Sequence, residues 1–178
     1  MRFELRAECT FSSELGPAKA DIEAVIARAK PILLKGAPRG KEAEAANIED
    51  WRVVGKKLEL TIESGRYVRA HDALFRLTKL LSEELGKKHK IGLRGVKGLE
   101  YEVTLPSPEL SEQAKRELAS LPCDVEVAER EVVLTLRELS EISLRGRVVD
   151  RLVAQAENII TKVPVPVTAP KVVQRGPR

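Results

Sequence analysis

The chain has 178 residues, of which 33% are charged and 43% apolar, enough for one domain with a buried core. It has no run of about eighteen apolar residues, which excludes a membrane-spanning helix, and its alternating charged N-terminus excludes a signal peptide. Residues 162–178 hold four cations and no acid; removing them from the 31 Lys and Arg leaves 27, equal to the 27 Asp and Glu. A polyanion site in the body must therefore be a local patch.

The composition also indicates a cellular setting. Aromatic residues make up 3%, Asn and Gln are rare, and Cys9 and Cys123 are the only cysteines. Two cysteines cannot form a disulfide framework or a four-ligand zinc site. Abundant Lys, Arg and Glu with few amides is the bias reported for hyperthermophiles. We expect a protein of a reducing and hot cytoplasm.

Two alternating segments dominate the first third of the chain. Phe3, Leu5, Ala7, Cys9 and Phe11 share one parity, which predicts a half-buried strand with Cys9 as a small core residue. A hinge at Gly55 separates two further strands. The expected elements are a strand at 3–11, a helix from Ala18 to near Pro31, a loop at 34–47, and strands at 48–54 and 57–64.

The remainder begins with the longest helix, about 68–86, whose apolar residues recur three and four apart and which Gly86 ends. The expected elements after it are strands at 89–95 and 99–105, a helix from Ser107 to Leu121, strands at 124–128 and 131–138, and a helix at 141–160. Tight connections at 55–56 and 96–98 require antiparallel neighbours.

These elements predict an α+β fold: an antiparallel sheet of about six strands with helices on one face. We expect one domain at 1–160. The segment 161–178, with four prolines and the cations Lys171, Arg175 and Arg178, predicts an extended tail or linker.

Motifs for chemistry are scarce. The sequence holds no nucleotide-binding glycine loop, no H-E-x-x-H and no G-x-S-x-G. His71 and His89 are the only histidines, and neither has a clustered thiol or carboxylate in the sequence. We therefore expect no catalytic residue, no metal and no cofactor.

The strongest local feature is the acid-free span 86–98, GKKHKIGLRGVKG. A strand here would bury Ile91 and Leu93 and project Lys90 and Arg94 outward, with Gly92 leaving the main chain open to close approach. Its five cations favour phosphate binding. They are Lys87, Lys88, Lys90, Arg94 and Lys97.

The preceding helix adds cations to the same surface. Arg76 and Lys79 are three residues apart and therefore neighbours on one helix face, and Arg66 and Arg69 precede them. With Arg94 they form one basic surface if the strand lies beside the helix. The alternative is a solvated face, salt-bridged through Asp72, Glu83 and Glu84. Few aromatics accompany these cations, which favours structured RNA recognised through backbone and shape over single strands recognised by stacking.

Two runs carry a family resemblance: SGRYVRAHDALFRL at 64–77 and LGKKHKIGLRG at 85–95. They resemble the N-terminal domain of methanogenic-type (archaeal) seryl-tRNA synthetases, and the similarity extends through MRFEL, KGAPRGKE and RVVDRL over most of the chain. The resemblance implies a six-stranded antiparallel sheet capped by helices. It also implies binding of the long variable arm of serine tRNA by Arg76, Lys79 and Arg94. Thr78 departs from the family pattern, where we expect another basic residue.

The family's class II catalytic domain has no counterpart in this sequence, so the resemblance implies a domain that does not act as an enzyme on its own. We expect a structured-RNA-binding module for the variable arm of tRNA. A second hypothesis is a free-standing ribosome-associated protein that binds ribosomal RNA with its basic face and tail. A third is an accessory subunit that contacts a synthetase catalytic subunit.

Overall fold

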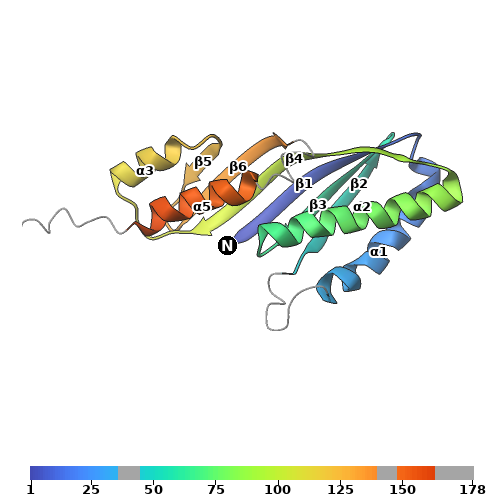
Figure 1. The fold of residues 1–178 in the computed structure, drawn as a ribbon, viewed down its shortest axis with the longest axis horizontal. Helices are drawn as coiled ribbons and strands as arrows, with labels where there is room; N and C mark the ends of the chain where they lie inside the picture. The colour runs from blue at the N-terminus through green and yellow to red at the C-terminus, as the bar shows by residue number, and fades with distance from the viewer. Residues whose placement is uncertain (36–44, 140–147, 163–178) are drawn as a thin grey trace, which may run out of the picture.

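The computed structural model describes residues 1–35, 45–139 and 148–162. The strands in this part form one antiparallel sheet of six (Figure 1), in the order β2-β3-β1-β4-β6-β5. The elements are β1 (Arg2–Phe11), the short 3-10 helix η1 (Gly16–Ala18), α1 (Lys19–Lys35), β2 (Asn47–Val54), β3 (Lys57–Ser64), α2 (Tyr67–His89), β4 (Leu93–Pro106), α3 (Glu112–Ala119), β5 (Asp124–Val127), β6 (Glu131–Leu139) and α5 (Val148–Thr161).

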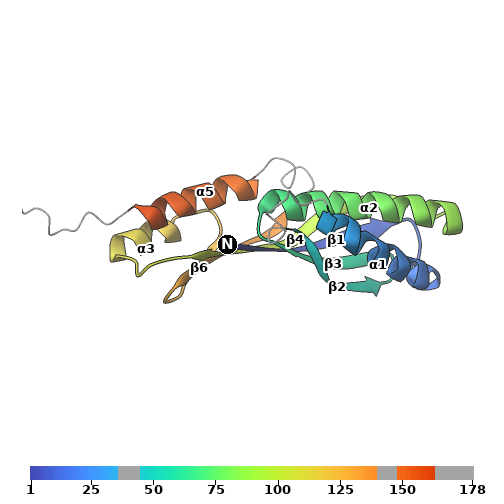
Figure 2. The same cartoon turned by 90° about the horizontal axis from the view of Figure 1, so that it is seen from below.

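The helices α1, α2 and α5 lie on one face of the sheet, and α3 packs at its end against α5 and β5 (Figure 2). The predicted α+β fold is confirmed. No helix in the described ranges has the length and apolarity needed to cross a membrane. The tail cations Lys171, Arg175 and Arg178 lie outside the described residues, so the division at residue 160 stays a prediction.

The first 106 residues form a β-α-β-β-α-β unit with the strand order β2-β3-β1-β4, the ferredoxin-like arrangement. The second half of β4, from Gly98 to Pro106, pairs with β6, and β5 follows. Strand β4 therefore belongs to both parts of the sheet. Its first residues, Leu93 to Lys97, pair with β1 but with no second strand in the described chain.

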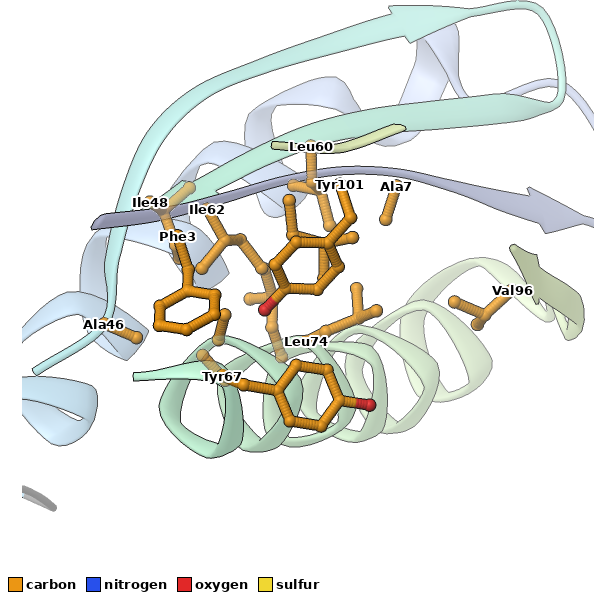
Figure 3. Packing of buried hydrophobic residues seen from close by; sticks show 14 of the residues in the cluster. Phe3, Ala7, Ala46, Ile48, Leu60, Ile62, Tyr67, Leu74, Val96 and Tyr101 are labelled. Atoms are coloured by element: carbon orange, nitrogen blue, oxygen red, sulfur yellow. The ribbon is translucent and has the colours of Figure 1, made fainter. Parts of the chain in front are cut away.

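The core lies between the sheet and the helices. The predicted apolar parity of β1 is buried throughout, and Leu60 and Ile62 of β3 pack beside it against Leu74 of α2 (Figure 3). Cys9 is fully buried as expected, and desolvation raises the pKa of its thiol to about 12. Its thiol therefore stays protonated and unreactive.

The predicted turn at 96–98 is wrong. Residues 93–106 form one continuous strand, because Arg6 and Ala7 of β1 pair with Glu100 and Gly98 and leave Leu99 as an extra residue in a bulge. The glycines at 95 and 98 suggest a turn in the sequence, but in the structure they belong to a strand with a bulge. The strands predicted at 89–95 and 99–105 are therefore a single strand, and the sheet has six strands in total.

Helix boundaries also differ from the prediction. Helix α2 continues past Gly86 to His89, and Lys90 ends it in the left-handed region at φ 55°. The N–H groups of Lys90 and Ile91 both donate to the Leu85 carbonyl, and Ile91 is 4% exposed. Burial of this apolar residue just after the cap fixes where the helix stops.

The other helices also differ from their predicted bounds. Helix α1 runs through Pro31 to Lys35. Ser111, and not the predicted Ser107, caps helix α3: the Ser111 hydroxyl accepts from the N–H of Ala114 at 3.1 Å, whereas Ser107 is buried and its N–H donates to the Arg130 carbonyl. Helix α5 begins at Val148; the rest of the helix predicted from 141 lies outside the described residues.

Candidate nucleic-acid interface

Helix α2 and the first part of β4 lie side by side and enclose a groove of about 370 Å³. Lys79 stands on the helix wall and Arg94 on the strand wall. The condition on which the predicted basic surface depends is therefore met. The lining residues are Phe75, Thr78, Lys79, Ser82 and Glu83 from α2 and Leu93, Arg94, Gly95 and Val96 from β4.

The amphipathic pattern of α2 explains why its cations face outward. Leu74, Leu77 and Leu81 are fully buried against the sheet, so Arg76 and Lys79, on the opposite side of the helix, are exposed. Arg76 lies beside Lys79 but outside the groove lining. The strand wall stays open because β6 begins to pair with β4 only at Gly98.

The electrostatics distinguish these cations from an ordinary charged surface. Within the described ranges, Arg76, Lys79 and Arg94 have no carboxylate oxygen within 4.0 Å. Of the three acids weighed as salt-bridge partners, only Glu84 forms a pair, with Lys88 at 3.1 Å. The groove therefore presents two cations that form no ion pair with the described residues, as phosphate binding needs.

Two predicted cations are engaged elsewhere. Lys88 also reaches Asp21 of α1 at 3.3 Å. Lys97 lies opposite Glu8 on β1 and pairs with it at 3.6 Å, on the sheet face away from the helices. Both retain exposed ammonium groups, but neither lines the groove.

The remaining predicted cations lie at the two ends of α2, outside the groove lining. Arg66 is exposed at the start of the helix and Arg69 is half-buried one turn later. Lys87 and Lys90 are exposed at its far end. There His89 Nε2 lies 2.6 Å from Asp21 Oδ2, a contact that, with Lys88, lowers the pKa of the Asp21 carboxyl. This contact joins the end of α2 to α1.

Two expectations from the sequence, one beside the groove and one within it, are not met. The main chain of Gly92 is not open, because its N–H donates to Ser12 Oγ at 2.9 Å and its carbonyl accepts from the Ser12 N–H at 2.8 Å. Gly95 instead lines the groove, with open space around it. Thr78 is 3% exposed and donates to the Phe75 carbonyl, so a buried position lacks the expected cation.

Sequence reasoning missed the opposite, open face of the sheet. Glu4 of β1 lies between Glu63 of β3 and Glu102 of β4 as direct cross-strand partners. Arg2 contacts both Glu4 and Glu63 at 3.0 Å, which lowers the pKa of Glu63. A hydrogen bond to Glu63, with burial, raises the pKa of Glu49 to about 7. Strand register, which the sequence does not reveal directly, creates this acidic row.

Comparisons with known proteins identify the family of this chain. A family model described as a tRNA-binding domain matches residues 1–158. The type-2 serine–tRNA ligase of Methanocaldococcus jannaschii is 37% identical over 155 residues, covering 86% of this chain and 30% of that protein. The corresponding ligase of Methanothermobacter thermautotrophicus is 36% identical over 163 residues, covering 90% and 31%.

A solved structure of M. kandleri SerRS in complex with A. aeolicus tRNASec matches with a TM-score of 0.80 and 31% identity, covering 99% of this chain and 35% of that one. The chain thus spans about 30% of the length of the curated relatives it matches. A match from residue 1 to residue 158 shows that the chain belongs to the tRNA-binding domain family.

Proposed function

We propose that this domain holds a tRNA by its long variable arm, with the arm's phosphate backbone in the groove between α2 and β4. The observation that carries the proposal is that Lys79 and Arg94 face one groove without carboxylate partners in the described chain. Arg76 lies on the same exposed side of the helix and extends the contact. Flanking contacts come from Arg66, Arg69, Lys87 and Lys90.

Recognition by shape rather than by base identity fits the residues of the groove. Lysine and arginine bind phosphates whatever the base, and A-form stems display their backbone and 2′-hydroxyls in a wide, shallow minor groove. Stacking on unpaired bases needs exposed aromatic rings, and Phe75 is the one aromatic residue in the groove lining. A duplex stem is therefore the favoured ligand.

We infer that this domain contributes binding and no chemistry, in a cytoplasmic setting. In the described ranges the histidines serve packing and α1–α2 contact: His71 lies among Tyr67 and Phe75, and His89 contacts Asp21. The thiol of Cys9 is buried. Amino-acid activation would then belong to the portion of the ligase relatives that this chain does not span.

The test is the affinity of the purified chain for serine tRNA and for the same tRNA lacking its variable arm. We expect the arm deletion and Arg94→Ala each to weaken binding roughly tenfold, since each removes phosphate contacts. Lys115→Ala, a surface lysine paired with Glu112 on α3, is the matched control and should bind as wild type. Equal affinity for both tRNAs would refute the proposal.

Ribosomal RNA and a synthetase subunit remain alternative partners. The ribosomal hypothesis depends on the basic tail, which lies outside the described residues. Sedimentation of a lysate on a sucrose gradient separates the possibilities: ribosomal co-migration after a moderate salt wash favours ribosomal RNA, and nuclease-resistant association with a synthetase favours a protein partner.

A further inference from the structure

The basic groove contains one acid, Glu83. It lines the same groove as Lys79 and Arg94, and its side chain is exposed. Within the described chain no cation lies within 4.0 Å of its carboxylate. An unneutralised carboxylate in the same groove as these two cations repels a polyanion, so its presence in a nucleic-acid groove needs a second explanation.

Its neighbours explain why Glu83 stays unpaired. Lys79 is four residues before Glu83, and a base that precedes its acid is the weaker order for a helical ion pair. One residue along, Glu84 precedes Lys88 in the stronger order, and those two side chains are 3.1 Å apart. Lys79 and Glu83 therefore both present their charges to whatever occupies the groove.

The chemistry of a carboxylate limits what it can contact on a nucleic acid. An ionised glutamate only accepts hydrogen bonds, and phosphate oxygens offer none. The hydrogen-bond donor that recurs on an RNA backbone is the ribose 2′-hydroxyl, which also distinguishes RNA from DNA. A strand whose phosphates lie at Lys79 and Arg94 brings its riboses alongside the same wall of α2.

We propose that Glu83 accepts a hydrogen bond from a ribose 2′-hydroxyl of the RNA strand held between Lys79 and Arg94, and that it makes the groove selective for RNA. The proposal rests on the proposed function, because it requires a nucleic-acid backbone in this groove. Lys79 and Arg94 supply affinity for the phosphates. Glu83 distinguishes RNA from DNA, although its negative charge weakens the attraction of the groove for either nucleic acid.

The experiment compares one stem-loop, with the sequence of a tRNA variable arm, made as RNA and as 2′-fluoro RNA. The 2′-fluoro form keeps A-form geometry but cannot donate a hydrogen bond. We expect the wild-type chain to bind the RNA roughly tenfold more tightly than the fluoro form, the effect of one charge-assisted hydrogen bond. In Glu83→Ala this ratio should fall to about one.

Asp72→Ala is the matched control. Asp72 is an equally charged and exposed acid on the same helix, outside the groove lining. We expect it to change the affinity for both stem-loops by the same factor and leave their ratio unchanged. A wild-type ratio near one, or a ratio that Glu83→Ala leaves intact, overturns the 2′-hydroxyl contact while tRNA binding stands.

Other outcomes are also decisive. If Glu83→Ala weakens binding of both stem-loops equally, and this loss disappears when the G·C pairs of the stem are replaced by A·U pairs, Glu83 contacts the guanine amino group and the hydroxyl assignment is wrong. If the wild-type chain binds neither stem-loop nor intact serine tRNA, the proposed function itself fails and the inference with it.

Discussion

The two faces of the sheet differ in how their charges are paired among the described residues: the groove on the helical side holds unpaired cations, and the charges of the open face form ion pairs. On the helical side, the groove between α2 and β4 holds Lys79 and Arg94 without ion pairs in the described residues. On the open side, Glu4, Glu63 and Glu102 lie in a row across three strands, and Arg2 pairs with Glu4 and Glu63. The net charge of the chain therefore does not indicate where a polyanion binds. The binding position depends on which face of the sheet each charged residue lies on.

The open face also differs from those of other RNA-binding sheets. RRM domains stack bases on aromatic residues of a four-stranded sheet. Here the outward residues of β1 are Glu4, Arg6, Glu8 and Thr10, none of them aromatic. A sheet of ferredoxin-like order thus covers its open face with paired charges, and the candidate RNA contacts lie on a helix and a strand edge.

The largest effect is expected from removing both groove cations. Lys79→Ala combined with Arg94→Ala should weaken serine tRNA binding roughly 100-fold and reduce the salt slope by about 2, since two phosphate contacts are lost. Filter binding over a range of salt concentrations measures both values, and the melting temperature should stay at the wild-type value. A salt slope equal to that of wild type would move the interface away from the groove.

The next effect concerns stability on the open face. Arg2→Ala leaves the carboxylates of Glu4, Glu49 and Glu63 facing one another, and we expect the free energy of unfolding to fall by about 1 kcal/mol at pH 8. Urea titration measures the loss. The tRNA affinity of the folded variant should match wild type, and a large loss of affinity would show that the faces are not independent.

A smaller effect is expected in the pH dependence of stability. The raised pKa of Glu49 means that the folded state binds its proton more tightly than the unfolded state. This contribution is complete below about pH 4.5 and is lost as the pH rises through about 7. Glu49→Gln should flatten that decline by less than about 1 kcal/mol, because the group is partly exposed. Calorimetry from pH 4.5 to 8.5 tests this, and an unchanged profile contradicts it.

The smallest effect is expected from a charge reversal on the open face. Glu102→Lys converts the acidic row to a mixed one, yet it should change tRNA affinity by less than about twofold, because the change lies on the face away from the groove. Competition binding against wild type resolves such a difference. An increase near tenfold would mean that the open face also contacts RNA.

Periodicity predicted the parts of the molecule that depend on local pattern. The parity of β1 and the apolar stripe of α2 are both buried as expected. The outward residues of α2 followed, so the exposure of Arg76 and Lys79 could be anticipated. Adjacency of α2 and β4 could only be stated as a condition, because it depends on tertiary packing.

The differences came from distant partners. Lys97 and Lys88 look like members of the basic span, but Glu8 and Asp21, far away in the sequence, bind them in the folded chain. Ser12, also distant in the sequence, accepts a hydrogen bond from the N–H of Gly92. The bulge at Leu99 depends on the register against β1. None of these partners can be identified from spacing within the span itself.

The long strand β4 has a mechanical consequence. Its 14 residues extend roughly 45 Å, from the wall of the groove to the end of the sheet near α3. Hydrogen bonds to β1 and β6 support it along overlapping lengths. If RNA binds at Arg94 as proposed, one continuous backbone would connect the bound RNA to the half of the sheet that α5 covers, so that a force on the RNA would be carried there along a single strand.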